Sequence, residues 1–177
     1  PDGAAVVAPL NRAAALFASR GLPVAATRDW HPPRHCSFRE QGGPWPPHCV
    51  AGTDGSGYVP ALRLPPDVLH VFKATRVDAD AYSGFAGTTL ADDLRRRGVT
   101  RVFIGGLATD YCVLNTARDA AASGFDVVVL ADAIRPVDAH PGDGARAEAS
   151  MRAAGAAFVT VDALDGGVGK TSAPATP

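Results

Sequence analysis

Cys112 is the residue of this chain whose position most favours chemistry. It closes the segment Gly105 to Cys112, between an apolar run at residues 101–104 that predicts a buried strand and a helix predicted over residues 111–123. Unpaired N–H groups and the positive end of a helix dipole favour a thiolate there, and the same N–H groups can hold an oxyanion. A small buried hydrophobe is the alternative interpretation, and the cysteine alone does not decide between them.

One aspartate and three histidines lie within twenty residues of one another. Asp29 and His31 are two apart, so in an extended segment their side chains point to the same face, and His35 and His48 follow in a long loop rich in proline and glycine. Such oxygen and nitrogen ligands can bind Zn, Mn or Fe, with water in the open positions. Ordinary polar loop residues are the alternative, but four such residues so close together favour a metal site.

A structural zinc site is a less favoured interpretation of the same loop. Cys36 and Cys49 adjoin His35 and His48, but the chain has no CxxC pair there. Adjacent residues rarely both bind one ion, so we do not expect the cysteines to be ligands.

Lys73 ends an apolar strand predicted over residues 68–73. A lysine at the edge of a sheet often only extends its charge into water, but near a thiol or a carboxylate it would stabilise the anionic form. Trp45, Tyr82 and Phe85 could surround an aromatic substrate, although core packing explains isolated aromatic residues at least as well.

Apolar strands alternate with helices along the chain. We predict helices over residues 4–20, 88–97, 111–123 and 142–154, and strands over 22–27, 68–73, 101–104, 126–130 and 157–161. This order predicts an α/β fold, a doubly wound parallel sheet with helices on both faces. Such sheets bind ligands outside the carboxyl ends of their strands, where Asp29, His31, Lys73 and Cys112 would meet.

Length and composition limit the remaining possibilities. The 177 residues suit a single domain over residues 1–164, and the small and polar residues of 165–177 predict a disordered tail. A net charge of -1 makes no case for nucleic acid or an anionic membrane as partner, and no apolar run reaches the ~20 residues of a membrane span. Three sparse cysteines fit a reducing cytoplasm, and a homo-oligomer is compatible with the sequence without being required by it.

Together these segments resemble the nicotinamidase/pyrazinamidase family, within the isochorismatase-like cysteine hydrolases, whose fold is a three-layer α/β/α sandwich. The resemblance covers residues from about 1 to 163, and its most specific stretches are WPPHCV at 45–50 and LATDYCV at 107–113. The other matching stretches are DWHP at 29–32, GT at 52–53, Lys73 and AYSGF at 81–85.

The resemblance implies a role for each matching residue. Cys112 would be the nucleophile and Lys73 the lysine of a Cys–Asp–Lys triad. The backbone N–H groups of Ala108 and Cys112 would form the oxyanion hole, and the Leu107–Ala108 peptide bond would be cis. The metal ligands would be Asp29, His31 and His48, with His35 as a further ligand in some members. The residues that line the substrate site would be Trp45, Tyr82, Leu107 and Ala108.

One part of the family pattern is absent from these 177 residues. The family's catalytic aspartate follows its first strand in a D-x-Q-x-D-F type motif, and Pro1-Asp2-Gly3 matches a region just downstream of it. We therefore expect that strand and its aspartate outside the given sequence. Asp110 fits the N-cap of a helix better than it fits a replacement base.

The activity that the resemblance implies is metal-assisted hydrolysis of nicotinamide to nicotinate and ammonia in NAD salvage, with pyrazinamide as a further substrate. Zinc is the favoured divalent ion, and manganese and iron are alternatives. Two other functions stay open. The protein could be another isochorismatase-like amidase that acts on a different small amide, or an inactive metal-binding homologue.

Overall fold

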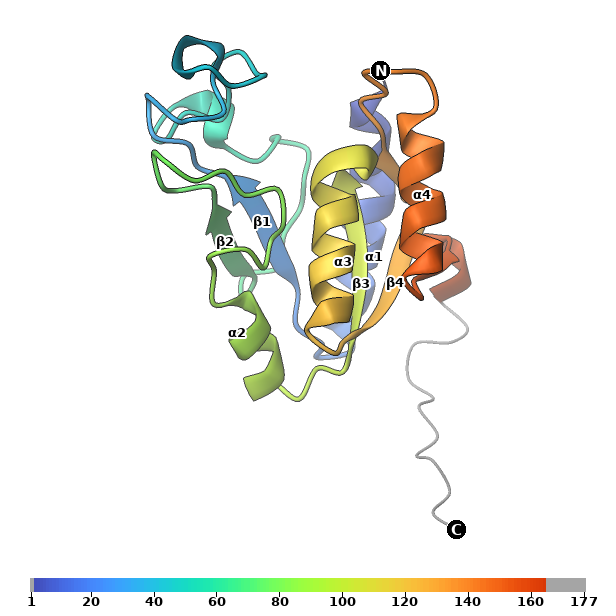
Figure 1. Ribbon diagram of the computed structural model, residues 1–177. Coiled ribbons are helices and arrows are strands. Elements are labelled where there is room, and N and C mark those ends of the chain that lie inside the picture. The colour runs from blue at the N-terminus through green and yellow to red at the C-terminus, as the bar shows by residue number, and fades with distance from the viewer. Residues whose placement is uncertain (1, 165–177) are drawn as a thin grey trace.

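The computed structural model describes residues 2–164, so the tail predicted over 165–177 lies outside the described residues (Figure 1). The helices are α1 (Val7–Ser19), α2 (Leu90–Arg96), α3 (Leu114–Ala122) and α4 (Asp143–Ala153). The strands are β1 (Ala25–Asp29), β2 (Leu69–Lys73), β3 (Arg101–Leu107), β4 (Asp126–Arg135) and β5 (Ala157–Val159). Short helical turns complete the described chain: η1 (Gly3–Val6), η2 (Arg39–Gln41), η3 (Asp54–Ser56), η4 (Thr109–Val113) and η5 (Val161–Leu164).

All the strand pairs are parallel, which confirms the predicted α/β class. β1 pairs with β2, and β3, β4 and β5 pair in that order. The hydrogen-bonded ladder is nevertheless in two parts, because within residues 2–164 β1 and β3 do not pair with each other. The carboxyl ends of β1 and β3 point to the same end of the molecule, where the long loops lie (Figure 1).

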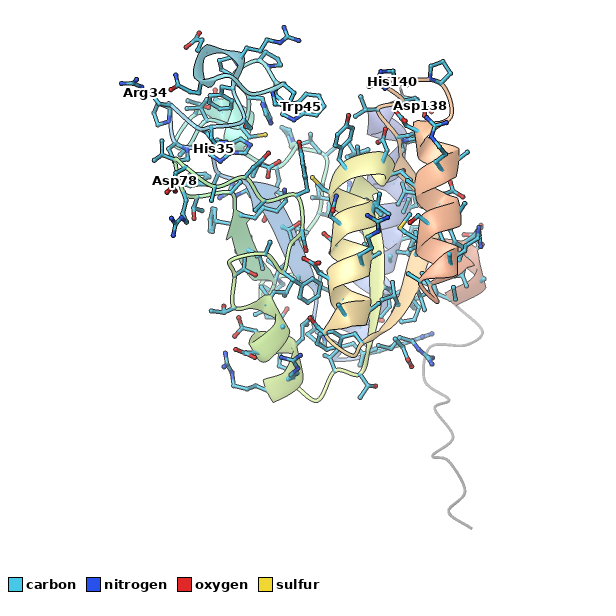
Figure 2. All side chains as sticks on the ribbon, viewed as in Figure 1. Arg34, His35, Trp45, Asp78, Asp138 and His140 are labelled. Atoms are coloured by element: carbon cyan, nitrogen blue, oxygen red, sulfur yellow. The ribbon has the colours of Figure 1, made fainter. Side chains whose placement is uncertain are left out.

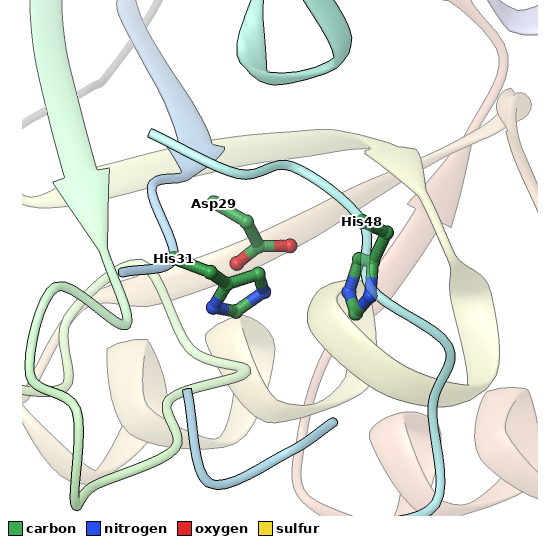
Figure 3. Close-up of side chains that lie close together, drawn as sticks. All are labelled: Asp29, His31 and His48. Atoms are coloured by element: carbon green, nitrogen blue, oxygen red, sulfur yellow. The ribbon is translucent and has the colours of Figure 1, made fainter. Parts of the chain in front are cut away.

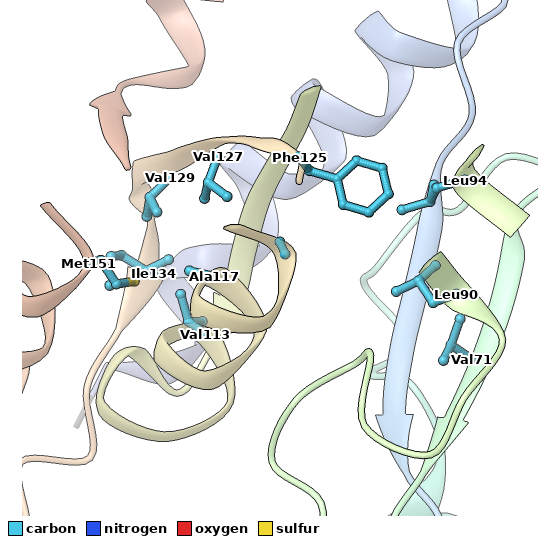
Figure 4. Close-up of a cluster of buried hydrophobic side chains, with 11 residues drawn as sticks. Val71, Leu90, Leu94, Val113, Ala117, Phe125, Val127, Val129, Ile134 and Met151 are labelled. Carbon is cyan, nitrogen blue, oxygen red and sulfur yellow. The ribbon is translucent and has the colours of Figure 1, made fainter. Parts of the chain in front are cut away.

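One hydrophobic core joins the two parts of the ladder. Val71 of β2 and Leu90 of α2 belong to the same buried cluster as Val129 of β4 and Met151 of α4 (Figure 4). Burying each such side chain contributes about 1.5–3 kcal/mol. The shared apolar layer therefore stabilises the arrangement although the strands at its centre exchange no hydrogen bonds.

Helix α1 covers the opposite face of the β3–β5 sheet. Its Ala13 lies in a second buried cluster with Leu130 and Ala133 of β4, and Phe17 contacts the ring of Phe103 at 5.0 Å between centroids. Gly105 lies under this helix, where a Cβ atom would come within 2.9 Å of Leu10. Helices therefore cover both faces, as predicted.

The largest boundary difference is at β4, which is predicted over 126–130 but covers Asp126–Arg135 because Ile134 and Arg135 continue the pairing with β3. β1 is displaced along the chain. The sequence predicts a strand over 22–27, but β1 covers Ala25–Asp29 and makes Asp29 its last residue. The guanidinium of Arg28 lies over the rings of Trp30, Tyr58 and Phe72 at 4.6–4.9 Å, and these cation–π contacts hold the segment extended beyond residue 27. Over residues 2–164, no helix has both the length and the apolar character needed to cross a membrane.

Candidate active site

Asp29, His31 and His48 come together at the carboxyl end of β1. One potential ligand atom from each lies within 4.8 Å of the others (Figure 3). Hydrogen bonds between the backbone of His31 and the loop bring His48 to the strand: His31 N–H donates to the Cys49 carbonyl at 3.0 Å, and Ala51 N–H donates to the His31 carbonyl at 2.8 Å. The juxtaposition that the spacing predicts is therefore present.

The side chains of this cluster have ligand atoms available for a cation. Among the described residues, Nδ1 of His31 is buried and has no hydrogen-bond partner. Burial lowers the pKa of His31, against the opposing effect of Asp29, so the ring is kept neutral as a ligand must be. Nδ1 of His48 donates to the Pro46 carbonyl at 2.8 Å, which leaves Nε2 with a free lone pair. Two imidazoles and a carboxylate in this state fit a divalent metal ion.

His35 lies beside the cluster but is not part of it. Its ring centroid is 4.2 Å from that of His31, yet its Nδ1 contacts Ser37 Oγ at 2.7 Å and its Nε2 contacts the Ala79 carbonyl at 3.2 Å. Binding a metal through His35 would break one of these hydrogen bonds, so its role as a further ligand stays a prediction. Within residues 2–164 the three cysteines are free, and none of them joins the group of potential ligands.

Cys112 lies in η4, a π-helical turn that leads directly into α3. The backbone N–H of Ala108 bonds to its sulfur, and Lys73 Nζ lies 3.4 Å from Sγ. Burial raises the pKa of Cys112, and Lys73 and the Ala108 N–H only partly oppose this effect. The helix start alone predicts a stabilised thiolate, but the structure favours the neutral thiol at rest because desolvation outweighs the nearby positive charge.

Lys73 connects the thiol with the metal-ligand cluster. Its side chain is 3% exposed, so it does not extend into water; it forms an ion pair with Asp29 and donates to the Ala81 carbonyl at 3.0 Å. Burial by itself lowers the pKa of Lys73, but the anionic form of Cys112 and the carboxylate of Asp29 outweigh burial and raise it. The ammonium therefore stays charged between a sulfur and a carboxylate.

The backbone segment just before Cys112 has one feature that the resemblance predicts. The Leu107–Ala108 peptide bond is cis, as the resemblance implies. Leu107 is half-exposed at the end of β3, and Ala108 begins the turn that carries the thiol.

Three aromatic rings gather beside Cys112, and the sequence predicts only two of them. Trp45 Nε1 donates to the hydroxyl of Tyr82 at 2.9 Å. The ring of Tyr111 lies 5.0 Å from that of Trp45 and 5.5 Å from that of Tyr82, between centroids. The place of Tyr111 beside Cys112 in the sequence was the available signal. Phe85, the third ring expected from the sequence, packs instead toward the main core, 5.9 Å from Phe125.

Asp110 does not cap the helix that follows it, and that prediction is wrong. Ala108 is the N-cap residue of η4 and makes no side-chain cap. Both carboxylate oxygens of Asp110 instead accept backbone N–H groups of Val137 and Asp138, each at 2.9 Å. Val137 is 27 residues from Asp110 in the sequence, and no local sequence pattern marks so distant a partner. The preference of aspartate for the N-cap position was the only signal available, and it favours the cap.

Comparison with known proteins places this geometry in a family. The isochorismatase domain matches residues 1–163. The chain is similar to the nicotinamidase of Escherichia coli strain K12, with 35% identity over 182 residues, 91% of this chain and 85% of that protein.

Two solved structures have a similar fold. The zinc complex of the Pyrococcus horikoshii pyrazinamidase has a TM-score of 0.86 at 46% identity and covers 90% of this chain and 87% of that one. An N-carbamoylsarcosine amidase from Thermoplasma acidophilum has a TM-score of 0.77 at 30% identity, with 92% and 86% covered. The chain belongs to the isochorismatase family of hydrolases, and within it to the nicotinamidase/pyrazinamidase group.

Proposed function

We propose that the protein is a cysteine amidohydrolase that converts nicotinamide to nicotinate and ammonia in NAD salvage and also accepts pyrazinamide. One observation carries this proposal: Lys73 Nζ is bonded to Asp29 and lies 3.4 Å from Cys112 Sγ. This contact brings a nucleophile, a cation and a metal-ligand cluster to one edge of the sheet. The named activities of similar proteins support the choice of amide.

In the proposed reaction, Cys112 Sγ attacks the carboxamide carbon. A C–S bond forms, the carbonyl oxygen gains the negative charge, and the backbone N–H groups of Ala108 and Cys112 stabilise it. The C–N bond then breaks and the nitrogen leaves as ammonia after it receives a proton. Water then hydrolyses the thioester: its oxygen joins the acyl carbon as the C–S bond breaks, one of its protons restores the thiol, and the other is released as the product ionises to the carboxylate.

The thiol must first give its proton to a base, because burial raises its pKa. Within residues 2–164, Asp29 is the carboxylate bonded to Lys73, and we assign Asp29 to the metal. The resemblance assigns the base to an aspartate after the family's first strand, outside residues 1–177. Within residues 2–164 the neighbouring edges of β1 and β3 do not pair with each other, so such a strand could form backbone hydrogen bonds with both.

Asp29, His31 and His48 would hold one divalent ion, with zinc favoured and manganese or iron as alternatives. When bound, this ion would supply a Lewis acid for the ring nitrogen of the substrate. Trp45 and Tyr82 would hold the substrate ring between them. Binding would break the hydrogen bond that Trp45 Nε1 donates to the Tyr82 hydroxyl.

The experiment is a panel of small amides with ammonia detection, run on the metal-loaded protein. We expect nicotinamide to be the fastest substrate, with pyrazinamide close to it. Cys112→Ala should abolish release, whereas Cys36→Ala, a matched change at a free cysteine outside the proposed machinery, should keep it. Comparable release by Cys112→Ala would refute the mechanism.

Two other functions each have an observation in their favour. Similarity to an N-carbamoylsarcosine amidase favours an amidase for another small amide, and faster release from a carbamoyl compound in the panel would select it. The cluster of potential metal ligands would serve an inactive metal-binding protein equally well. Reading the gene upstream of Pro1 separates this case: a strand that ends in Asp-x-Gln supports the enzyme. Absence of ammonia release by the metal-loaded protein with all its upstream residues would support inactivity.

A further inference from the structure

Asp110 makes a contact that the proposed chemistry does not use. It lies in η4, two residues before Cys112, and its carboxylate bonds to the segment between β4 and α4. Oδ1 accepts the N–H of Val137 and Oδ2 accepts the N–H of Asp138, each at 2.9 Å. A carboxylate that accepts two adjacent backbone N–H groups makes strong, charge-assisted hydrogen bonds at both oxygens.

The segment that Asp110 binds is itself fixed to α4. Asp138 has a φ of 53°, and its Oδ1 accepts the N–H of Gly144 in the first turn of α4 at 2.8 Å. Pro136 packs so closely on Gly144 that a Cβ added there would lie 2.7 Å from Pro136 Cβ. Figure 2 shows Asp138 and His140 at the start of α4, at the same end of the molecule as Trp45. Asp110 therefore ties the nucleophile turn to a rigid neighbour.

We propose that Asp110 is a positioning residue, whose carboxylate holds the Cys112 turn against residues 136–138 and so sets the Cys112 N–H and Sγ for attack. The proposal rests on the proposed function, because it assigns the turn to Cys112 as nucleophile. Its physical basis is that core packing of Val113 fixes one side of the turn, so without the bonds of Asp110 the rest of the turn could rotate about the helix axis. Displacing a reacting group by about 1 Å can cost about 100-fold in rate.

The test compares Asp110→Asn with Asp143→Asn. Asn at 110 keeps one acceptor oxygen and sets an NH₂ group against the other backbone N–H. Asp143 lies at the other end of the same connection, where it accepts the N–H of His140 and pairs with Arg146, so its change to Asn removes an equal charge while both hydrogen bonds of Asp110 stay in place. We expect kcat to fall about 10–100-fold in Asp110→Asn with KM nearly unchanged, and both to stay near wild type in Asp143→Asn.

A substrate-free readout separates this proposal from the proposed function. Amide hydrogen exchange at residues 109–113 should accelerate in Asp110→Asn, and more in Asp110→Ala, but not in Asp143→Asn. If no amide is hydrolysed by the wild type, the proposed function fails and exchange alone decides about Asp110. Equal kcat or equal exchange in Asp110→Asn and Asp143→Asn would overturn the positioning role. If Asp110→Ala does not fold, Asp110→Asn, which keeps one acceptor, still decides.

Discussion

The turn that carries Cys112 and the loop that carries His48 position their side chains by different means. The turn continues into α3, and Val113 and Ala117 anchor it in the main core. The loop is held by backbone hydrogen bonds to its neighbours, such as Trp45 N–H to the Ser37 carbonyl at 3.0 Å, and Pro46 and Pro47 within it are exposed. The proposed nucleophile therefore depends on apolar packing and on the two hydrogen bonds of Asp110, whereas the proposed metal ligands depend on local hydrogen bonds and would depend on a bound ion.

This difference has a physical consequence. Apolar burial and the hydrogen bonds of Asp110 should keep η4 in place with or without a cation, whereas a bound cation would link side chains from β1 and from the loop directly. Lys73 is the contact between the two regions, because it bonds to Asp29 on one side and to Cys112 on the other. Four experiments separate the regions, from the largest expected effect to the smallest.

Cys112→Ala should remove chemistry without removing metal. We expect amide turnover to fall at least about 1,000-fold, since loss of a nucleophile that acts with its partners removes most of the catalysis. Metal content, measured by inductively coupled plasma mass spectrometry, should equal that of the wild type because Cys112 is not among the clustered ligands. Loss of metal in this variant would show that the two regions are not independent.

His48→Ala should have the converse effect. Metal affinity should drop by more than the roughly 10–100-fold that follows loss of an outer-shell partner, because a direct ligand is removed. Iodoacetamide should alkylate Cys112 at the same rate in this variant as in the metal-free wild type, because core packing holds the turn in place. Measurement of both quantities on one preparation tests the comparison, and a large change in alkylation would contradict it.

Lys73→Met breaks the contact between the regions. Lys73 lowers the pKa of Cys112 against the effect of burial, so its loss should raise that pKa further. The pH profile of Cys112 alkylation should move to higher pH, and kcat should fall about 100-fold. Lys73→Arg keeps the charge and is the control: its alkylation profile should lie between those of wild type and Lys73→Met. An unchanged profile in Lys73→Met would exclude an electrostatic role for the lysine.

The metal-free protein should lose stability on acidification. Burial lowers the pKa of His31 below 6.5, so the unfolded chain binds more protons than the folded one once the pH falls below that value. The stabilisation is complete above pH 6.5 and is lost as the pH falls through the folded pKa. The free energy of unfolding, measured with urea from about pH 7.5 to about pH 5, should decrease as the pH falls. His31→Gln should make the slope of this decrease smaller. His140→Gln, at a side chain that is 86% exposed, should keep the slope of the wild type.

Several features could be predicted because short-range patterns encode them. Apolar runs mark β2 and β4, and the spacing of Asp29 and His31 places both side chains on one side of the extended chain. The order of the strands then brings Lys73 to the same edge as Cys112. These predictions depend only on periodicity and on the rule that parallel strands end at one edge.

Other features depend on contacts between distant segments, and the sequence could not supply them. Tyr111 joins Trp45 and Tyr82 only because three separate segments meet, and Phe85 faces the core because Phe125 lies there. Only the packing around it shows that Asp110 bonds to the connection before α4 instead of capping its own helix.

The sequence by itself determined the α/β class and predicted which thiol, lysine and candidate metal-ligand side chains meet at one edge of the sheet. Residue type and spacing are properties of the chain alone, so they can be read before folding. The tertiary structure decided the direction in which the pKa of Cys112 moves, because desolvation by burial raises it more than Lys73 lowers it. It also decided that Lys73 joins the thiol to Asp29, because burial and the distances between groups exist only once the distant segments have packed together.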